Sequence, residues 1–230
     1  MILSAVIGAA VSAAFAYLCY GAPCKWLCDY GENPSEKHSK AARKPTAARY
    51  AFFAAAGAIC TCLYARNATV LASLCFSAFC GAMLWLGWCD AKYGILPDEI
   101  IIIAVVLALP LAISEDIAAS LMGAVLAFGV SYGILWLAGK IYHTDAVGMG
   151  DVKLAAAAGF ACGIGGVAAA AMIAIFSAAI VFSVLMLAKK LNKRDNVPFG
   201  PYLVFGILAA LCFKPELTSL VNLYLSAFKL

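Results

Sequence analysis

Two aspartates lie in the sequence where an ionised side chain is costly. Asp90 ends the apolar run that starts at Trp85, and Asp151 follows Gly148-Met149-Gly150 and opens another apolar run. An acid close to hydrocarbon indicates a functional site or a charge that has a partner. These two acids are therefore the first candidates for chemistry.

Hydrolysis of a peptide bond by carboxyl groups would explain why two acids are wanted together. An ionised carboxylate takes a proton from water, while a protonated carboxyl group polarises the scissile carbonyl. Two carboxyl groups at one site divide a single proton, because both cannot be ionised side by side, and they titrate as a unit. Gly148 and Gly150 leave space beside Asp151 in which a substrate backbone can approach closely. The pattern predicts a dyad formed by Asp90 and Asp151.

A structural role is the competing interpretation of both acids. An aspartate at a helix end is often a solvated cap. Lys92 and Lys153 are also close enough in sequence to neutralise Asp90 and Asp151. Position alone does not separate these roles. The other ionisable residues near both acids are interpreted as helix caps or loop residues: Asp98, Glu99, Asp145 and His143.

The elements that must position the two acids are transmembrane helices. Of the 230 residues, 65% are hydrophobic and 12% are charged, whereas a soluble domain carries about 25% charged residues. Apolar runs recur along the chain without the alternation of barrel strands. The predicted fold class is all-α, a polytopic transmembrane helical bundle. We predict eight spans: residues 1–20, 48–65, 68–89, 98–114, 117–138, 151–163, 166–188 and 199–213.

The distribution of basic residues predicts the orientation of these spans. With the N-terminus outside, thirteen Lys and Arg residues fall on the cytoplasmic side and three fall outside, as the positive-inside rule requires. This count needs a turn at Gly163–Gly166, without which the cluster Lys189–Arg194 would lie outside. Asp90 and Asp151 then lie at similar depth at the cytoplasmic boundary of the membrane.

We predict a single membrane domain over residues 1–230. Residues 1–20 carry no charge and are expected to remain as a helix, since basic residues follow this stretch and a signal peptide would begin with them. Residues 21–49 form a cytoplasmic loop whose Lys and Arg are expected to contact anionic lipid. The tail after Lys214 is expected to lie along the outer interface. The motifs that carry chemistry fall within residues 80–213.

The ten cysteines lie mostly inside apolar spans, where a thiol behaves as a small hydrophobic group. Only Cys24 and Cys28 lie in the polar loop, and His38 would add a third zinc ligand. A structural zinc site needs four ligands, and the sequence suggests no fourth. Two reduced cytosolic thiols are the favoured interpretation, so no metal and no cofactor is expected.

Three motifs follow one another over residues 80–213. The first is Asp90, separated by six residues from Pro97-Asp98. The second is Gly148-Met149-Gly150-Asp151-Val152-Lys153-Leu154, with Gly159 and Gly163 beyond it. The third is Val197-Pro198-Phe199-Gly200-Pro201-Tyr202. This combination, much more specific than a lone Gly-x-Gly-Asp, resembles the type IV prepilin peptidase family of membrane aspartic proteases.

The resemblance implies a function and a set of site residues. Such enzymes cleave the basic leader of prepilins and pseudopilins at the cytoplasmic membrane face, after a Gly and before an apolar transmembrane segment. By resemblance, Asp90 and Asp151 are the catalytic aspartates, and Gly148 and Gly150 are the motif glycines. The expected partners are a prepilin or pseudopilin and membrane lipid, with no nucleic acid. The third motif would line the substrate site with Pro198, Phe199, Gly200 and Pro201.

The sequence departs from longer members of that family in its loop. Those members carry two Cys-x-x-Cys pairs in a cytoplasmic domain that is associated with methylation of the new N-terminus. Here a short loop keeps one loosely spaced pair, Cys24 and Cys28. Methyltransferase activity is therefore not expected.

Two rival functions stay open at this point. Another Gly-x-Gly-Asp protease, such as a preflagellin peptidase, shares the second motif, whereas presenilin-type enzymes have Tyr where Cys89 precedes Asp90. A transporter or a non-catalytic scaffold is the rival from another class, because intramembrane acids also serve as proton relays. The absence of a repeat between the two halves of the sequence, and the position of both acids at one face, disfavour a transporter.

Overall fold

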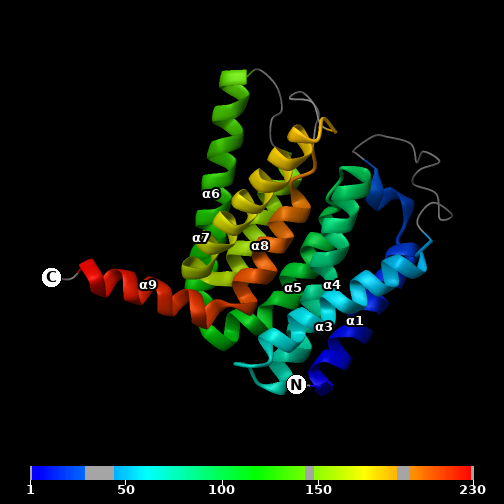
Figure 1. The fold of residues 1–230 in the computed structure, drawn as a ribbon, viewed down its shortest axis with the longest axis horizontal. Helices are drawn as coiled ribbons and strands as arrows, with labels where there is room; N and C mark the ends of the chain where they lie inside the picture. The colour runs from blue at the N-terminus through cyan, green and yellow to red at the C-terminus, as the bar shows by residue number, and fades with distance from the viewer. Residues whose placement is uncertain (1, 29–43, 143–147, 191–196, 229–230) are drawn as a thin grey trace.

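The computed structural model is a bundle of helices (Figure 1) and describes residues 2–28, 44–142, 148–190 and 197–228. His38, His143, Asp145 and Arg194 lie outside the described residues. The regular elements within the described ranges are α1 (Ile2–Gly21), the short 3₁₀ helix η1 (Cys24–Leu27), α3 (Ala47–Tyr64), α4 (Val70–Tyr93), α5 (Asp98–Glu115), α6 (Ile117–Tyr142), α7 (Met149–Leu187), α8 (Gly200–Cys212) and α9 (Lys214–Phe228).

Local signals set where several helices begin and end. The hydroxyl groups of Thr46 and Thr69 accept hydrogen bonds from backbone N–H groups in the first turns of α3 and α4. Asp116 Oδ1 accepts a hydrogen bond of 2.9 Å from a backbone N–H at the start of α6. α4 ends at Gly94, which has the left-handed conformation typical of a glycine after a helix.

α4 lies at the centre of the bundle, where it packs against α1, α3, α5 and α8. Phe76, Phe79 and Met83 of α4 are fully buried. A helix that is apolar all round is expected inside a bundle. α6 packs mainly against α7 and leaves Met122 and Val125 exposed, as expected of a helix that faces lipid.

α7 consists of two halves that reverse direction at Gly163, whose φ is 69° and ψ 176°. The first half ends at Cys162, whose carbonyl accepts a hydrogen bond of 3.4 Å from Lys214 at the start of α9. The second half returns toward the start of α8, where Phe182 packs edge-on against Tyr202. The turn predicted in this glycine-rich stretch is confirmed.

The bundle has two ends, and we call the one that holds Asp90 and Asp151 the site end and the other the far end. α4 and α6 end at the site end, and α3, α5, α7 and α8 begin there. α9 starts at the far end, bends by 79° from α8 and runs away from the bundle (Figure 1).

The predicted spans fall on these helices and on the two halves of α7. Five helices are long and apolar enough to cross a membrane, or six if the bent pair α8–α9 forms one span. Two differences between the predicted and the observed helix boundaries bear on the site. α4 continues to Tyr93, so Asp90 lies within its last turn and not beyond its end. Pro97 is the N-cap of α5, so Asp98 is the first helical residue and not the cap.

Candidate active site

Asp90 and Asp151 meet at the site end from two different helices. Asp90 lies in the last turn of α4 and is 7% exposed. Asp151 is in the first turn of α7 and is partly buried. The two carboxyl groups are near enough for the charge of Asp90 to act on Asp151. The fold therefore brings together the two acids that the sequence singled out.

Asp90 is held by the N-terminus of α8. The backbone N–H of Gly200 donates a buried hydrogen bond of 2.8 Å to Oδ2 of Asp90. Gly200 is the first residue of α8, and Pro201 follows it, as is common in the first turn of a helix. The free N–H groups and the macrodipole at a helix N-terminus stabilise a carboxylate. The third motif therefore contacts the first through its backbone.

The contact between α8 and Asp90 requires glycine at position 200. A Cβ atom at Gly200 would lie 2.7 Å from Oδ2 and 2.9 Å from Cγ of Asp90. Real Cβ atoms do not approach other atoms so closely, so any larger residue would push the carboxyl group away. This steric requirement explains why glycine stands between the two prolines of the motif.

Asp151 has different surroundings from Asp90. Its backbone N–H bonds to the carbonyl of Gly148 at 3.1 Å, which closes the first turn of α7. Its side-chain Oδ1 is buried and has no hydrogen-bond partner among the described residues. Buried polar atoms are nearly always paired in proteins, so this oxygen is suited to a water molecule or a substrate.

The two motif glycines differ in what surrounds them. Gly148 is exposed, and a Cβ there would make an ordinary contact of 3.8 Å with Asp151. A Cβ at Gly150 would lie 2.9 Å from Cβ of Leu96, in the segment between α4 and α5. Gly150 is therefore needed for packing, whereas packing does not explain Gly148.

The neighbouring lysine does not neutralise Asp151. Lys153 Nζ forms an ion pair of 2.5 Å with Asp98 Oδ2, which joins the first turns of α7 and α5. The ammonium group of Lys92 lies 5.3 Å from the ring centroid of Tyr93. The structural alternative, in which Lys153 serves as the partner of Asp151, is wrong.

Arg49 is a charged residue near the site that the sequence analysis did not single out. It lies in the first turn of α3, is 3% exposed, and its guanidinium carbon is 5.4 Å from the ring centroid of Trp88. A desolvated cation–π contact of this kind is worth about 2 kcal/mol. Thr46, a helix-capping residue three positions earlier, was the signal that α3 already includes Arg49.

The described residues contain no group of three or more His, Cys, Asp or Glu side chains arranged to hold a metal ion. In the segment after α1, Cys28 Sγ donates a hydrogen bond of 3.3 Å to the carbonyl of Cys24. His38, the third zinc ligand considered above, lies outside the described residues.

The fold and the site define a polytopic helical membrane protein with a pair of carboxyl groups at one end of its bundle. The model of the type IV leader peptidase family matches residues 77–184, which include Asp90 and Asp151. The leader peptidase HopD of Escherichia coli is 30% identical over 144 residues, which cover 54% of this chain and 82% of that protein. The chain therefore belongs to the type IV leader peptidase family.

Two further relatives carry a longer name. The prepilin leader peptidase/N-methyltransferase of Burkholderia pseudomallei (strain 1026b) is 29% identical over 182 residues, 74% of this chain and 57% of that protein. The protein of the same name from Bacillus subtilis (strain 168) is 33% identical over 93 residues, 40% of this chain and 37% of that protein. The chain thus spans little more than half the length of the Burkholderia relative. No solved structure matches the chain.

Proposed function

We propose that the protein is an aspartic endopeptidase that cleaves the leader of a prepilin or pseudopilin at the cytoplasmic face of the inner membrane. The observation that carries the proposal is the meeting of Asp90 and Asp151 at the site end. Membership of the leader peptidase family supports peptide hydrolysis, and the names of the relatives supply the class of substrate.

The different surroundings of the two acids support different roles. The N–H of Gly200 and the N-terminus of α8 favour the ionised form of Asp90. Asp151 has no donor on Oδ1 among the described residues, and a proton on it removes the repulsion from Asp90. We therefore assign the general base to Asp90 and the general acid to Asp151.

The proposed reaction then follows ordinary acid–base chemistry. Asp90 takes a proton from a water molecule as the water oxygen attacks the scissile carbonyl carbon, while Asp151 gives its proton to the carbonyl oxygen. The tetrahedral intermediate breaks at the C–N bond. The proton on Asp90 goes to the leaving amine, and the proton on the oxygen returns to Asp151.

The substrate is proposed to approach the dyad along the exposed side of the second and third motifs. Gly148 is exposed beside Asp151, so an extended substrate backbone can lie against it. The third motif begins at the same end and contributes side chains that are partly exposed: Pro198, Phe199 and Pro201.

The charges at the two ends support a cytoplasmic site. Among the described residues, eight Lys and Arg side chains belong to segments at the site end and two belong to the far end, as expected when the site end faces the cytoplasm. The eight are Lys25, Lys44, Arg49, Lys92, Lys140, Lys153, Lys189 and Lys190, and the two are Arg66 and Lys214.

Cleavage of a co-expressed prepilin tests the proposal. In membranes with equal amounts of each variant, Asp90→Asn and Asp151→Asn should each remove cleavage, because neither acid can make both proton transfers. The double variant should be no worse than either single one, since the two residues act as a unit. Asp98→Asn is the matched control at the same end and should be far milder. Near-normal cleavage by Asp151→Asn would contradict the assignment and favour a transporter or scaffold.

A further inference from the structure

Three cysteine side chains from three helices meet toward the far end of the bundle. Cys60 belongs to α3, Cys80 to α4, and Cys212 is the last residue of α8. Cys212 Sγ lies 3.4 Å from the carbonyl oxygen of Cys60, to which it donates a hydrogen bond. The thiol of Cys60 also contacts the thiols of Cys212 and Cys80. None of the ten cysteines of the chain forms a disulfide in this structure.

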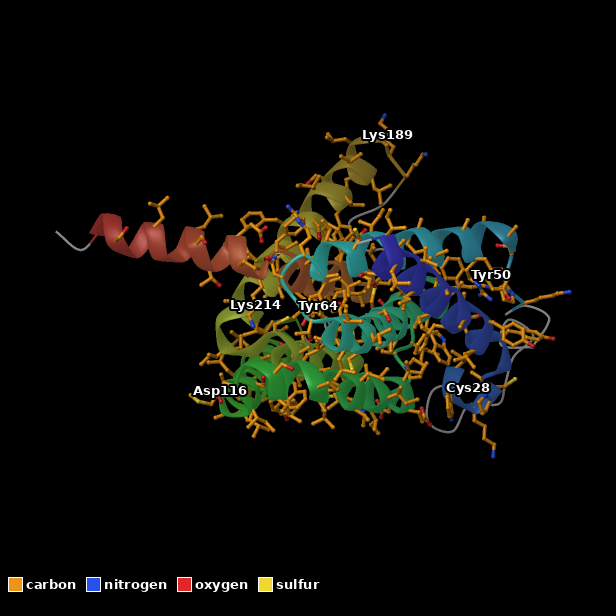
Figure 2. All side chains as sticks on the ribbon, turned by 90° about the horizontal axis from the view of Figure 1, so that it is seen from below. Cys28, Tyr50, Tyr64, Asp116, Lys189 and Lys214 are labelled. Carbon is orange, nitrogen blue, oxygen red and sulfur yellow. The ribbon has the colours of Figure 1, made fainter. Side chains whose placement is uncertain are left out.

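Two members of this thiol cluster are reached from outside the bundle, since Cys60 is partly exposed and Cys212, although buried, lines a crevice. A crevice of about 310 Å³ at the far end is lined by Tyr64, Leu211, Cys212 and Lys214, among others. Figure 2 shows Tyr64 and Lys214 beside each other where α9 leaves the bundle. Cys80 is fully buried and does not line the crevice. A small thiol-reactive molecule can therefore reach Cys60 and Cys212 but not Cys80.

We propose that Cys60 and Cys212 form a disulfide that joins α3 to α8 when the far end meets an oxidising compartment. The oxidant is a disulfide, either a small molecule or an oxidoreductase. The thiolate of Cys60, the more exposed of the two residues, attacks one of its sulfurs and releases one thiol, and the Cys212 thiolate then displaces the second. Two protein thiols and one disulfide thus become one protein disulfide and two released thiols. In the orientation proposed above, the far end faces the outside of the inner membrane, where disulfides persist.

The disulfide between Cys60 and Cys212 would act on α8, whose opposite end contacts Asp90. α8 has 13 residues, so Cys212 lies roughly 20 Å along the helix axis from Gly200. A helix of this length moves as a unit, so a bond between Cys212 and α3 would also restrict the N-terminus that contacts Asp90. We expect the oxidised protein to unfold at a temperature several degrees higher than the reduced protein.

The chain contains a matched control for this inference. Cys19 of α1 and Cys89 of α4 form a second pair of thiols in contact, 1% and 0% exposed. Neither residue lines either of the two crevices at the far end. If contact between thiols alone decided oxidation, both pairs would react. If access from outside the bundle is also required, only Cys60 and Cys212 will be joined.

Oxidised glutathione is the probe for the experiment on the purified full-length protein in detergent. After oxidation, the remaining thiols are alkylated and the peptides are mapped by mass spectrometry. We expect a peptide pair linked through Cys60 and Cys212, with Cys19 and Cys89 unlinked, and a higher unfolding temperature that dithiothreitol reverses. Cys212→Ser should lose both the link and the shift, while Cys80→Ser should keep both. Cys60→Ala replaces Cys212→Ser if the latter does not fold.

Three results would overturn the proposal. They are the absence of a linked peptide in the wild-type protein, a link from Cys60 to Cys80 in place of Cys212, and equal linkage of Cys19 and Cys89. None of these readouts depends on peptidase activity, so the disulfide and the proposed function can fail separately.

Discussion

The backbone N–H of Gly200, at the start of α8, bonds to the carboxyl group of Asp90 on α4 and thereby influences its acid–base chemistry. Because a Cβ at position 200 would lie 2.7 Å from the carboxylate, Gly200→Ala must displace Asp90 or the start of α8. A hydrogen bond to a charged group contributes about 1.5–3 kcal/mol, so we expect kcat to fall about 10- to 100-fold while KM changes little. The measurement is the kinetics of prepilin cleavage by purified protein.

Gly133→Ala is the control for this substitution, since a Cβ at Gly133 on α6 meets no atom within 4 Å. It should leave both kinetic constants unchanged. A wild-type kcat for Gly200→Ala would show that the N–H contact at Asp90 does not matter for the reaction.

The two glycines before Asp151 should respond differently to the same change. Gly150→Ala forces Leu96 to move, so we expect a lower unfolding temperature and less protein in the membrane. Gly148→Ala meets no tight contact, so it should lower stability only by the small cost of replacing the N-cap glycine of α7 with alanine. If substrate approaches over Gly148, the added methyl group will raise KM for the prepilin several-fold. An unchanged KM would remove Gly148 from the substrate site.

At the scale of the helices, the reversal inside α7 depends on one residue. The φ of 69° and ψ of 176° at Gly163 belong to a region that residues with a side chain rarely occupy, at a cost of about 1–3 kcal/mol. We expect Gly163→Ala to lower the unfolding temperature by several degrees, measured in detergent. Gly165→Ala is the matched control, because a Cβ there meets nothing within 4 Å. Equal unfolding temperatures for the two variants would contradict a strained turn at Gly163.

The sequence predicted those features that depend on local composition. Apolar runs of sufficient length marked the helices, and the glycines after Cys162 marked the turn in α7. The end of α4 was missed because apolarity stops at Asp90 while the helix continues through polar residues to Tyr93. The two acids could be identified because charged residues are rare in this chain, so an aspartate beside an apolar run is easy to recognise in the sequence.

Contacts between distant segments could not be predicted in the same way. The residues of the third motif do not predict that the N–H of Gly200 bonds to Asp90, because this contact depends on how α8 packs against α4. The burial of Arg49 against Trp88 depends likewise on the packing of α3 against α4. The residue types of a site are therefore easier to predict in a membrane protein than the contacts that position them.

At the scale of the whole molecule, the two ends of the bundle have different chemistry. The site end has the dyad, the start of α8 and most of the described basic residues, whereas the far end has the thiol cluster, the crevice and α9. This division follows from the reversal in α7. If α7 continued straight past Gly163, its last residues and the start of α8 would lie at the far end, away from Asp90. The same feature thus decides both the end of the bundle at which Lys189 and Lys190 lie and the assembly of the site.

Labelling from outside the cell tests this arrangement. With the site end in the cytoplasm, a cysteine introduced by Arg66→Cys, in the turn between α3 and α4, should react with a membrane-impermeant maleimide in intact cells. A cysteine introduced by Lys190→Cys, beyond the second half of α7, should react only after the cells are permeabilised, because the hairpin returns it to the cytoplasmic side. Peptide mapping distinguishes both from the native cysteines. Labelling of residue 190 in intact cells together with protection of residue 66 would invert the proposed orientation. Labelling of both in intact cells would contradict the return of α7 to the site end.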